Sequence, residues 1–388
     1  MNTATRDFIE SHLKDDVRQL ALQKFPDDVD KTLVLNQIEA RQILSKKVPS
    51  WASNPDLLFP KHLSIEQCSS ELTAKYKASI INGGDVFVDL TGGLGIDSYF
   101  LSERFKTSYY VENQKELCDL AEHNFAVLGR KITVVNSDAE TFLSKNHDFD
   151  LIFIDPARRD IYNRKMVSLH DCSPDVVHLV ETHGRTSQQY LIKASPMLDI
   201  SLITNELKNI SEVHIVSVKN ECKEVLVLLR PDYNGEIMIH CVDLSPAGKR
   251  YAFPLRDEQS AIPTFATTIK KYLYEPNAAI MKAGAFKLVS QRFAIEKLHV
   301  NSHLYTSDNL ISDFPGRIFE VVGFAPFNKK IKKELLKYVD EASVAVRNFP
   351  LSANELRKNL NLKESDKNFV FGTTMQGEKK VLLLCKRI

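Results

Sequence analysis

The stretch Asp89-Leu90-Thr91-Gly92-Gly93-Leu94-Gly95 decides the fold of this chain. It follows a strand-like apolar run that begins at Val86, and it precedes a helical pattern that begins at Ile96. The glycines let the backbone turn tightly and approach a ligand closely. The helix that follows directs unpaired backbone N–H groups toward that ligand. The stretch therefore predicts a strand, a loop and a helix that together bind a nucleotide-like molecule.

Two other glycine-rich loops can be compared with this one. A phosphate-binding P-loop ends in Gly-Lys-Ser or Gly-Lys-Thr, which this loop lacks. The dinucleotide fingerprint GxGxxG would require a third glycine where Ser98 stands. Both patterns fit poorly, so residues elsewhere in the chain must identify the ligand.

Short apolar runs alternate with helical patterns on either side of the loop. This alternation is typical of right-handed βαβ crossovers, which build a parallel sheet covered by helices. One helix is expected from Ile96 to Phe105 and another through Leu117 and Leu128. Strands are expected at residues 86–90, 108–111, 132–135, 151–154, 190–193, 213–218 and 225–229.

The last two of these strands are joined by only six residues, Lys219 to Glu224. So short a link cannot hold a crossover helix, so the two strands must form a hairpin with one strand antiparallel to the sheet. A reversed final strand distinguishes class I methyltransferases from dinucleotide-binding dehydrogenases. Any other doubly wound domain with an antiparallel edge strand remains an alternative at this point.

The chain is predicted to be an α/β protein with four parts. Residues 1–63 are expected to be helical, with apolar residues from Phe8 to Leu22 in helix-like spacing. Residues 64–231 are expected to form the Rossmann-like sheet domain, which begins with a helix at 64–81. Residues 232–318 are expected to contain a β-hairpin with strands at 237–242 and 250–254, and a mixed, ferredoxin-like segment. Residues 319–388 are predicted to form a small basic α/β domain, in which a helix begins at the capping box Ser352-Ala353-Asn354-Glu355. Another helix is expected from Lys330 to Tyr338.

Acidic residues follow three of the strands that come after the loop. Glu112 follows the second strand, Asp138 the third and Asp155 the fourth. The carboxyl ends of parallel strands open onto one crevice, so these carboxylates are expected at one ligand site. Each alone could equally be a helix cap or a solvated carboxylate. Their joint occurrence favours a nucleoside-containing ligand.

With these residues in place, the stretch from about Ser64 to Arg230 resembles class I S-adenosylmethionine-dependent methyltransferases. The resemblance implies that Asp89 orders the glycine loop or contacts the amino group of the cofactor. It also implies that Glu112, with Asn113 beside it, holds the ribose. Gly93 and Gly95 are implied to line the methionine part, and Asp138 with Ala139 to meet the adenine. Thr91 and Asp155 are the other residues that the resemblance assigns to the cofactor.

Four further motifs are similar to a bacterial methyltransferase family that ends in a THUMP-like domain. They are Glu66-Gln67-Cys68-Ser69-Ser70-Glu71, Asp155-Pro156-Ala157-Arg158-Arg159, Lys193-Ala194-Ser195-Pro196 and Tyr274-Glu275-Pro276. This resemblance spans most of the chain. Since THUMP domains occur in tRNA-modifying enzymes, it implies an RNA substrate, by analogy at the level of a small fold.

The segment that begins at Asp155 is the expected reaction centre. Enzymes that methylate amines of nucleic-acid bases usually carry Asn/Asp-Pro-Pro-aromatic there, whereas this chain has Ala157 and Arg158. Tyr162 is close enough along the chain to supply an aromatic ring if the loop folds back. Ser69, Ser70 and Thr73 could close over the cofactor or could equally be helix caps. Asp155 and Pro156 are expected to contact the attacking group, while Arg158, Arg159 or Lys193 could bind phosphate or carboxylate.

A thiol for methylation of carbon 5 of uridine is missing at the expected position. The Asp-Pro-Ala-Arg wording resembles enzymes of that kind, whose cysteine ends the fifth strand, where this chain has Ala194. Cys172 lies nearby in the sequence but is more typical of a packing residue. A base nitrogen is therefore the expected acceptor.

Basic charge is concentrated in the C-terminal region. Residues 323–388 contain 14 Lys and Arg against 7 Asp and Glu, although the whole chain has a formal net charge of only +1. Lysines at the start of a helix oppose the helix dipole, so local stability does not explain them. The pattern favours binding of tRNA or rRNA, although a solvated charged face is an equal alternative. The basic side chains concerned are Lys329, Lys330, Lys332, Lys333, Lys379, Lys380, Lys386 and Arg387.

The bulk properties of the 388 residues exclude several classes of protein. No apolar run approaches the roughly 20 residues of a membrane helix, and the N-terminus lacks the regions of a signal peptide. The cytoplasm is therefore the expected location. The six cysteines form no CxxC pair, so we expect neither disulfides nor a metal site. A small-molecule or protein methyltransferase, or a non-catalytic RNA-binding protein that senses the cofactor, remains the alternative function.

Overall fold

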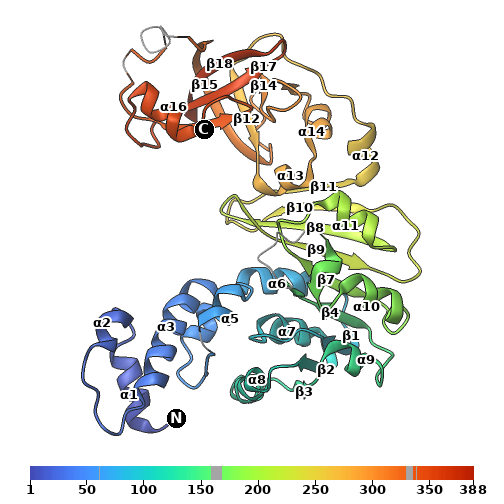
Figure 1. Ribbon diagram of the computed structural model, residues 1–388. Coiled ribbons are helices and arrows are strands. Elements are labelled where there is room, and N and C mark those ends of the chain that lie inside the picture. Colours follow the sequence, from blue (N-terminus) through green and yellow to red (C-terminus); the bar gives the residue numbers. More distant parts are fainter. Residues whose placement is uncertain (61, 159–167, 329–334, 338) are drawn as a thin grey trace. The chain divides into compact units, whose positions relative to one another are not determined.

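The computed structural model describes residues 1–60, 62–158, 168–328, 335–337 and 339–388, with only the backbone described at residues 62–64 and 158 (Figure 1). The chain forms two compact units. The first comprises Met1–Ser211 and Val225–Gly235, and the second comprises Glu212–Glu224 and Glu236–Ile388. The division runs through the hairpin that the sequence predicts.

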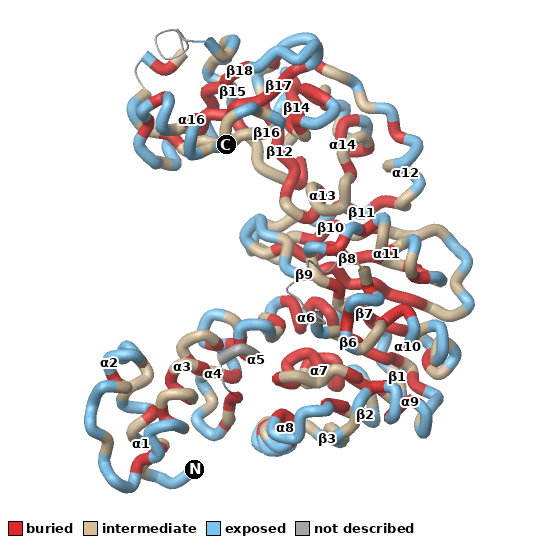
Figure 2. The backbone as a smooth tube through the Cα atoms, in the orientation of Figure 1, coloured by how far each residue is buried: buried red, intermediate tan, exposed pale blue. Residues whose placement is uncertain are grey.

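The first unit is built on a mostly parallel sheet with the strand order β9-β7-β4-β1-β2-β3. All its neighbouring strands are parallel except β7 and β9, which are antiparallel. The strand β4 is buried along its whole length, as Figure 2 shows for the centre of this sheet. The strands are β1 (Gly84–Asp89), β2 (Phe105–Glu112), β3 (Thr133–Asn136), β4 (Leu151–Ile154), β7 (Tyr190–Ala194) and β9 (Glu221–Leu229).

The predicted hairpin is present, and its strands are longer than the sequence indicates. The strand β8 (Ile210–Val218) leads directly into β9 through the turn residues Lys219 and Asn220. Both have positive φ angles, 52° and 60°, which are typical of the two-residue turns that suit twisted strands. The expected six-residue link is therefore wrong, but the reversed strand and the α/β class I fold are confirmed.

The helix after the glycine loop is shorter than expected. The helix α7 (Ile96–Leu101) ends four residues before Phe105, and a 3-10 turn leads into β2. Phe105 instead begins β2, where it pairs with Gly84 and stacks its ring on Phe87 at 5.3 Å between centroids. Tertiary packing thus overrides the helical pattern. The other helices that follow in this unit are α8 (Lys115–Val127), α9 (Ala139–Leu143), α10 (Val176–His183) and α11 (Ile200–Glu206).

The N-terminal region is helical, as predicted, but it is divided differently. The pattern from Phe8 to Leu22 forms two short helices, and Leu22 is exposed instead of buried. Ser70 interrupts the expected helix at 64–81 because its hydroxyl caps a new helix by accepting a hydrogen bond from Thr73 N at 3.2 Å. The helices are α1 (Thr3–Ser11), α2 (Val17–Ala21), α3 (Lys31–Lys47), α4 (Pro49–Ala52), α5 (His62–Gln67) and α6 (Glu71–Ile80).

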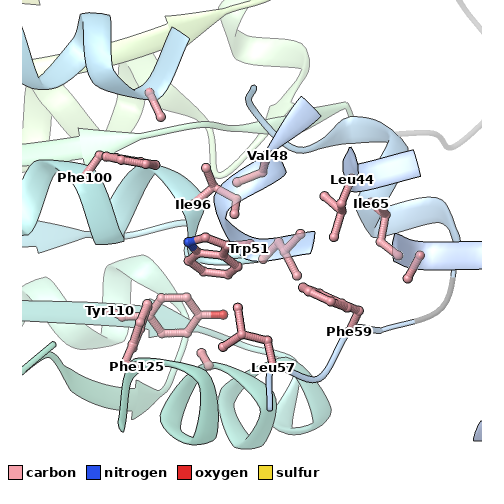
Figure 3. Packing of buried hydrophobic residues seen from close by; sticks show 14 of the residues in the cluster. Leu44, Val48, Trp51, Leu57, Phe59, Ile65, Ile96, Phe100, Tyr110 and Phe125 are labelled. Atoms are coloured by element: carbon pink, nitrogen blue, oxygen red, sulfur yellow. The ribbon is translucent and has the colours of Figure 1, made fainter. Parts of the chain in front are cut away.

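One hydrophobic core joins the helices α3 to α6 to the sheet (Figure 3). Trp51 of α4 is 1% exposed and packs in the same cluster as Phe100 of α7, Tyr110 of β2 and Phe125 of α8. Buried polar groups hold the segment between α4 and α5 against this core. Asn124 of α8 bonds both the N–H and the carbonyl of Leu58, at 2.9 and 2.8 Å. The N-terminal helices therefore belong to the first compact unit.

The second unit begins with three strands. The strand β10 (Met238–Asp243) pairs in parallel with β8 and antiparallel with β11 (Arg250–Pro254). The predicted hairpin of 237–242 and 250–254 is thus confirmed. Its parallel pairing with β8 is an addition that the sequence did not indicate.

A seven-stranded sheet forms the rest of the second unit, in the order β13-β14-β12-β15-β18-β17-β16. The capping box at Ser352 begins α16 (Ala353–Leu360) as predicted, whereas the expected helix from Lys330 to Tyr338 lies largely outside the described residues. The helices that come next after β11 along the chain are α12 (Leu255–Ser260), α13 (Ala278–Ala283) and α14 (Phe286–Arg292). The strands are β12 (Tyr272–Pro276), β13 (Glu296–Lys297), β14 (Tyr305–Ser307), β15 (Gly316–Pro326), β16 (Ser343–Arg347), β17 (Phe369–Met375) and β18 (Lys379–Arg387).

Among the described residues, no helix combines the length and the apolar character needed to cross a membrane.

Candidate functional site

The glycine loop has the conformation that its sequence predicts. Gly95 caps α7 with φ of 80°, and a Cβ atom there would lie 2.8 Å from Cζ of Phe125. A Cβ atom on Gly92 would lie 2.2 Å from the ring of Tyr110. Both positions therefore exclude a side chain, for different reasons. The hydroxyl of Tyr110 donates to the carbonyl of Gly93 at 2.6 Å and fixes the loop from below.

Asp89, at the end of β1, orders the loop from inside. Its Oδ1 accepts from Thr91 N at 2.9 Å and from the Thr91 hydroxyl at 3.3 Å, while its Oδ2 accepts from the Ser98 hydroxyl at 2.5 Å. The residue is 1% exposed. Burial raises the pKa of Asp89 to about 7, although these donors act in the opposite direction. Of the two expected roles, the ordering of the loop is the one seen in these contacts.

Glu112 ends β2 directly across from the loop. Its Oε2 accepts from Gly93 N at 3.1 Å, and its Oε1 accepts from Gln114 N at 2.9 Å. A carboxylate has about four lone-pair positions, so Glu112 keeps acceptor capacity for a ligand. Asn113, next to it, is exposed, and its carbonyl accepts from the side chain of Asn136 at 3.0 Å.

Asp138 caps a helix. Its Oδ1 accepts from Thr141 N at 2.8 Å at the start of α9, and this bond lowers the pKa of Asp138. The carboxylate is exposed, while Ala139 beside it is buried. The helix cap thus accounts for the hydrogen bond of one carboxylate oxygen of Asp138. A contact of the other carboxylate oxygen with adenine stays a prediction.

Asp155 and Lys193 meet at the carboxyl ends of β4 and β7. Their side chains form an ion pair, and Lys193 Nζ also donates to the Ser69 hydroxyl at 3.1 Å. The backbone N–H of Asp155 donates to the Thr91 hydroxyl at 2.7 Å, which connects this pair to the glycine loop. The Asp155 side chain keeps 35% of its surface exposed. Partial burial raises the pKa of Asp155, and Lys193 offsets only part of that rise.

A buried charge network lies behind this pair. Lys77 of α6 is completely buried, and its Nζ lies 3.2 Å from Oδ1 of Asp97. The Ser69 hydroxyl donates to Oδ2 of Asp97 at 2.7 Å, and Lys193 Nζ lies 3.6 Å from the same oxygen. Burial raises the pKa of Asp97, but Lys77 and Lys193 outweigh it and hold the pKa below its usual value. Two cations and two carboxylates thus compensate one another around Ser69.

Lys77 and Asp97 are not among the residues that the sequence indicated for this site. A lysine in a helix is usually solvated, and Asp97 looks like an ordinary acidic residue in the first turn of α7. Ser69 was expected near the cofactor or as a helix cap. Ser69 is the shared partner of both lysines, and the helix cap is Ser70. A position of Ser69 near the cofactor stays a prediction.

Part of the expected reaction centre lies beyond the described residues. Arg159 and Tyr162 fall in the undescribed segment, and only the backbone of Arg158 is described. That backbone forms β5 (Ala157–Arg158), which pairs antiparallel with β6 (Cys172–Ser173). Cys172 is 1% exposed, and Pro156 is half-buried beside Asp155.

A hollow in the first unit lies at the other edge of the sheet. Phe149, Ser187 and Arg230 line it, at the amino ends of β4 and β7 and just after the antiparallel β9. Asp89, Glu112 and Asp155 stand at the opposite ends of their strands. This hollow is therefore not the site that these acidic residues form.

Two family matches cover the C-terminal part of the chain. Residues 272–315 match a family of ferredoxin-like domains. Residues 316–387 match a family of THUMP domain-like domains.

A solved structure of a candidate methyltransferase from Porphyromonas gingivalis W83 resembles the chain over nearly its whole length. The two sequences are 35% identical, and the match covers 99% of this chain and 97% of that chain with a TM-score of 0.88. The chain belongs to the same family. Together with the reversed strand β9 and the THUMP-like match, this makes it a class I S-adenosylmethionine-dependent methyltransferase with a C-terminal THUMP-like domain.

More distant structures match only part of this methyltransferase. TrmK from M. capricolum, in complex with S-adenosylhomocysteine, is 14% identical over 43% of this chain and 70% of that chain, with a TM-score of 0.33. An rRNA methylase from Streptococcus thermophilus is 13% identical over 41% of this chain and 93% of that chain, with a TM-score of 0.31. A search of curated proteins gives no match.

The residues around the glycine loop fit S-adenosylmethionine. A Cβ atom at Gly93 would meet only the carbonyl of Thr91, at 3.7 Å, so the backbone here is open to a ligand. Glu112 offers the remaining lone pairs of a carboxylate, which suit the two hydroxyls of a ribose. Asp89 lies buried close to the loop with a pKa of about 7, so it is partly ionised at neutral pH, and its ionised form suits the amino group of the methionine part.

Proposed function

We propose that this methyltransferase modifies a nitrogen atom of a base in tRNA or rRNA. The observation that carries the RNA substrate is the THUMP-like match at residues 316–387, together with the exposed basic side chains in that region. The acceptor site proposed for the base is Asp155 with Pro156 and Lys193, at the carboxyl edge of the sheet.

The proposed cofactor contacts follow from the geometry of the loop. Gly93 and Gly95 border the methionine part, Thr91 and Asp89 hold the loop, and Glu112 accepts from the ribose. Adenine is proposed to lie against Ala139, with Asn113 and Asp138 at its exposed side. When bound, S-adenosylmethionine supplies a methyl group already activated by the sulfonium. The protein then needs mainly to align donor and acceptor.

Asp155 is proposed to accept a hydrogen bond from the attacking amine. Its raised pKa makes it a better proton acceptor than an ordinary aspartate, and its exposed third can face a substrate. Lys193 fixes the carboxylate from the buried side, and Ser69 in turn fixes Lys193. Arg158 is proposed to bind a phosphate of the RNA.

Methylation of a carbon atom would require a cysteine that can add to the base. The end of β7 carries Ala194, which is buried and has no nucleophile. Cys172 is buried on β6 and pairs through its backbone with Arg158. Both features favour nitrogen as the acceptor.

The basic side chains on β18 support RNA binding at two separate places. Lys379 and Lys380 begin this strand, and Lys386 and Arg387 end it. All four are exposed, which suits contacts with backbone phosphates. The strand separates the pairs by about 20 Å at roughly 3.4 Å per residue, so they would contact different phosphates. Lys329, Lys330, Lys332 and Lys333 lie outside the described residues.

Methyl transfer to RNA tests this proposal. Purified protein and S-adenosylmethionine labelled in the methyl group are incubated with total RNA from cells that lack the gene. We expect label in RNA, identified by mass spectrometry of nucleosides as an N-methylated base, and at least about a hundredfold slower transfer by Asp155→Ala. Label in added protein or metabolites, with none in RNA, would exclude an RNA substrate.

RNA binding gives a second test. Charge reversal at Lys379 and Lys380 is expected to weaken RNA binding. It should also reduce the slope of log affinity against log salt concentration by about 0.7–0.9 for each phosphate that the protein no longer neutralises. Reversal at the exposed Lys14 and Lys24 of the first unit serves as a control and should change little. If both pairs of charge reversals weaken RNA binding equally, RNA binding depends only on the overall charge of the protein.

A further inference from the structure

Three potential metal ligands converge in the second unit, whereas the residues proposed for methyl transfer belong to the first unit. Glu212 and His214 lie on β8, and His240 lies on β10. Since β8 and β10 are parallel neighbours (Figure 1) with His214 directly opposite His240, the two imidazoles project from the same face. Glu212, two residues before His214, shares that face. The ligand atoms of the three side chains all lie within 4.8 Å of one another.

Both imidazoles turn the same nitrogen toward one carboxylate oxygen. His214 Nε2 lies 3.1 Å and His240 Nε2 lies 3.4 Å from Oε2 of Glu212. The rings are stacked, with centroids 4.4 Å apart and planes inclined by 8°. Ligands that share a metal with bonds of about 2.1 Å are separated by about 3.0 Å at octahedral and about 3.4 Å at tetrahedral angles. The observed N–O separations match this range.

Burial and charge around the three side chains suit a cation. The side chain of His214 is 4% exposed, while those of Glu212 and His240 are 25% and 30% exposed, so the site can be reached from solvent. Glu212 places a carboxylate beside the two imidazoles, and this combination of ligands suits a bound cation.

We propose that Glu212, His214 and His240 form a binding site for a divalent transition metal, with Zn²⁺ as the best match. Two imidazoles and one carboxylate are a usual set of zinc ligands. Three protein ligands leave at least one coordination position for water or a ligand, as in zinc sites that are not purely structural. The metal joins β8 to β10. Cysteine spacing gave no sign of this site because none of its ligands is a cysteine.

Metal titration of the full chain tests the proposal. The protein is treated with chelator, and Zn²⁺ binding is followed by calorimetry. Co²⁺ is then added as a spectroscopic substitute. We expect one equivalent of Zn²⁺ to bind tightly, with Co²⁺ giving ligand-field bands without thiolate charge transfer. His240→Ala and Glu212→Gln are each expected to weaken binding at least about tenfold.

His147→Ala is the matched control, since His147 is exposed and near an acidic residue of the first unit. It should bind Zn²⁺ as the unaltered chain does. His240→Gln replaces the imidazole by a polar side chain of similar size at a partly exposed position. It provides a second variant if His240→Ala fails to fold. Absence of tight binding, unchanged affinity in the β8 and β10 variants, or thiolate bands with Co²⁺ would each overturn the proposal. The first outcome would leave the two histidines as hydrogen-bond partners of Glu212.

Discussion

Replacement of Gly95 by alanine examines the glycine loop most sharply. Gly95 combines a left-handed backbone, φ of 80°, with a Cβ position that lies 2.8 Å from Cζ and 3.2 Å from Cε1 of Phe125. Gly129 offers a matched comparison because its φ is 65° and nothing lies within 4 Å of its Cβ position. The two substitutions share the backbone strain and differ in the contact with Phe125.

The expected magnitudes follow from these two contributions. A left-handed alanine costs about 1–2 kcal/mol, and this cost applies to both variants. Overpacking against a buried ring adds about 1–3 kcal/mol, and this cost applies only at Gly95. The reason is that Phe125 is 2% exposed and packs in the same hydrophobic cluster as Trp51. The free energy of unfolding of Gly95→Ala is therefore expected to fall by about 2–5 kcal/mol, and that of Gly129→Ala by about 1–2 kcal/mol.

The assay is urea unfolding followed by the fluorescence of Trp51. This residue is the only tryptophan of the chain, and it packs in the same cluster as Phe125, so its signal reports on the first unit. Calorimetry with S-adenosylhomocysteine measures the second consequence. Gly95→Ala should abolish measurable binding, because the displaced loop carries Gly93 and Thr91, whereas Gly129→Ala should bind normally.

A double substitution identifies the contact itself. Phe125→Leu shortens the ring that alanine at position 95 would meet, so it should recover part of the stability that Gly95→Ala removes. If Gly95→Ala is no less stable than Gly129→Ala and binds S-adenosylhomocysteine equally well, the proposed packing of the loop on Phe125 is wrong.

Three more outcomes are expected. Asp97→Asn leaves Lys77 buried without its anionic partner, so it should lower the free energy of unfolding by about 3–5 kcal/mol, measured by urea unfolding with Trp51 fluorescence. Substitution of both residues by apolar ones should recover most of this loss. An unchanged urea midpoint for Asp97→Asn would contradict the buried network. Glu112→Gln replaces a charged acceptor, so it should weaken S-adenosylhomocysteine binding by about 1.5–3 kcal/mol in calorimetry. Unchanged binding would mean that Glu112 does not contact the ribose. The folded-state pKa of Asp89, about 7, lies above the unfolded value, so the stability of the unaltered chain relative to Asp89→Asn should fall as pH rises from about 4 to 7. A difference that stays constant or grows with pH, measured from urea midpoints, would refute the raised pKa.

Much of the cofactor site could be predicted because it depends on local patterns. Asp89 and Glu112 each follow a short apolar run, and parallel strands bring such ends to one edge by geometry alone. The glycine loop is equally local. The hairpin of β8 and β9 was recognised from the short link, although its turn was misplaced, since Lys219-Asn220 lacks the Asn-Gly or Asp-Gly signal of a two-residue turn.

The charge network and the β8–β10 cluster could not be predicted from the sequence in the same way. Lys77 and Asp97 lie on different helices, and their meeting depends on how α6 packs beside α7. His214 and His240 meet only because β10 pairs in parallel with β8. Neither contact has a sequence signature, because each depends on packing between distant elements.

Methyl transfer in a mixture of substrates is the decisive measurement for the proposed RNA substrate. Labelled S-adenosylmethionine is offered to total RNA, protein extract and small metabolites from cells without the gene, with the unaltered chain and with Asp155→Ala. We predict that label enters RNA alone, at an N-methylated base, and that Asp155→Ala nearly abolishes it. Label in protein or metabolites, or equal labelling of RNA by Asp155→Ala, would contradict an RNA methyltransferase that acts through Asp155.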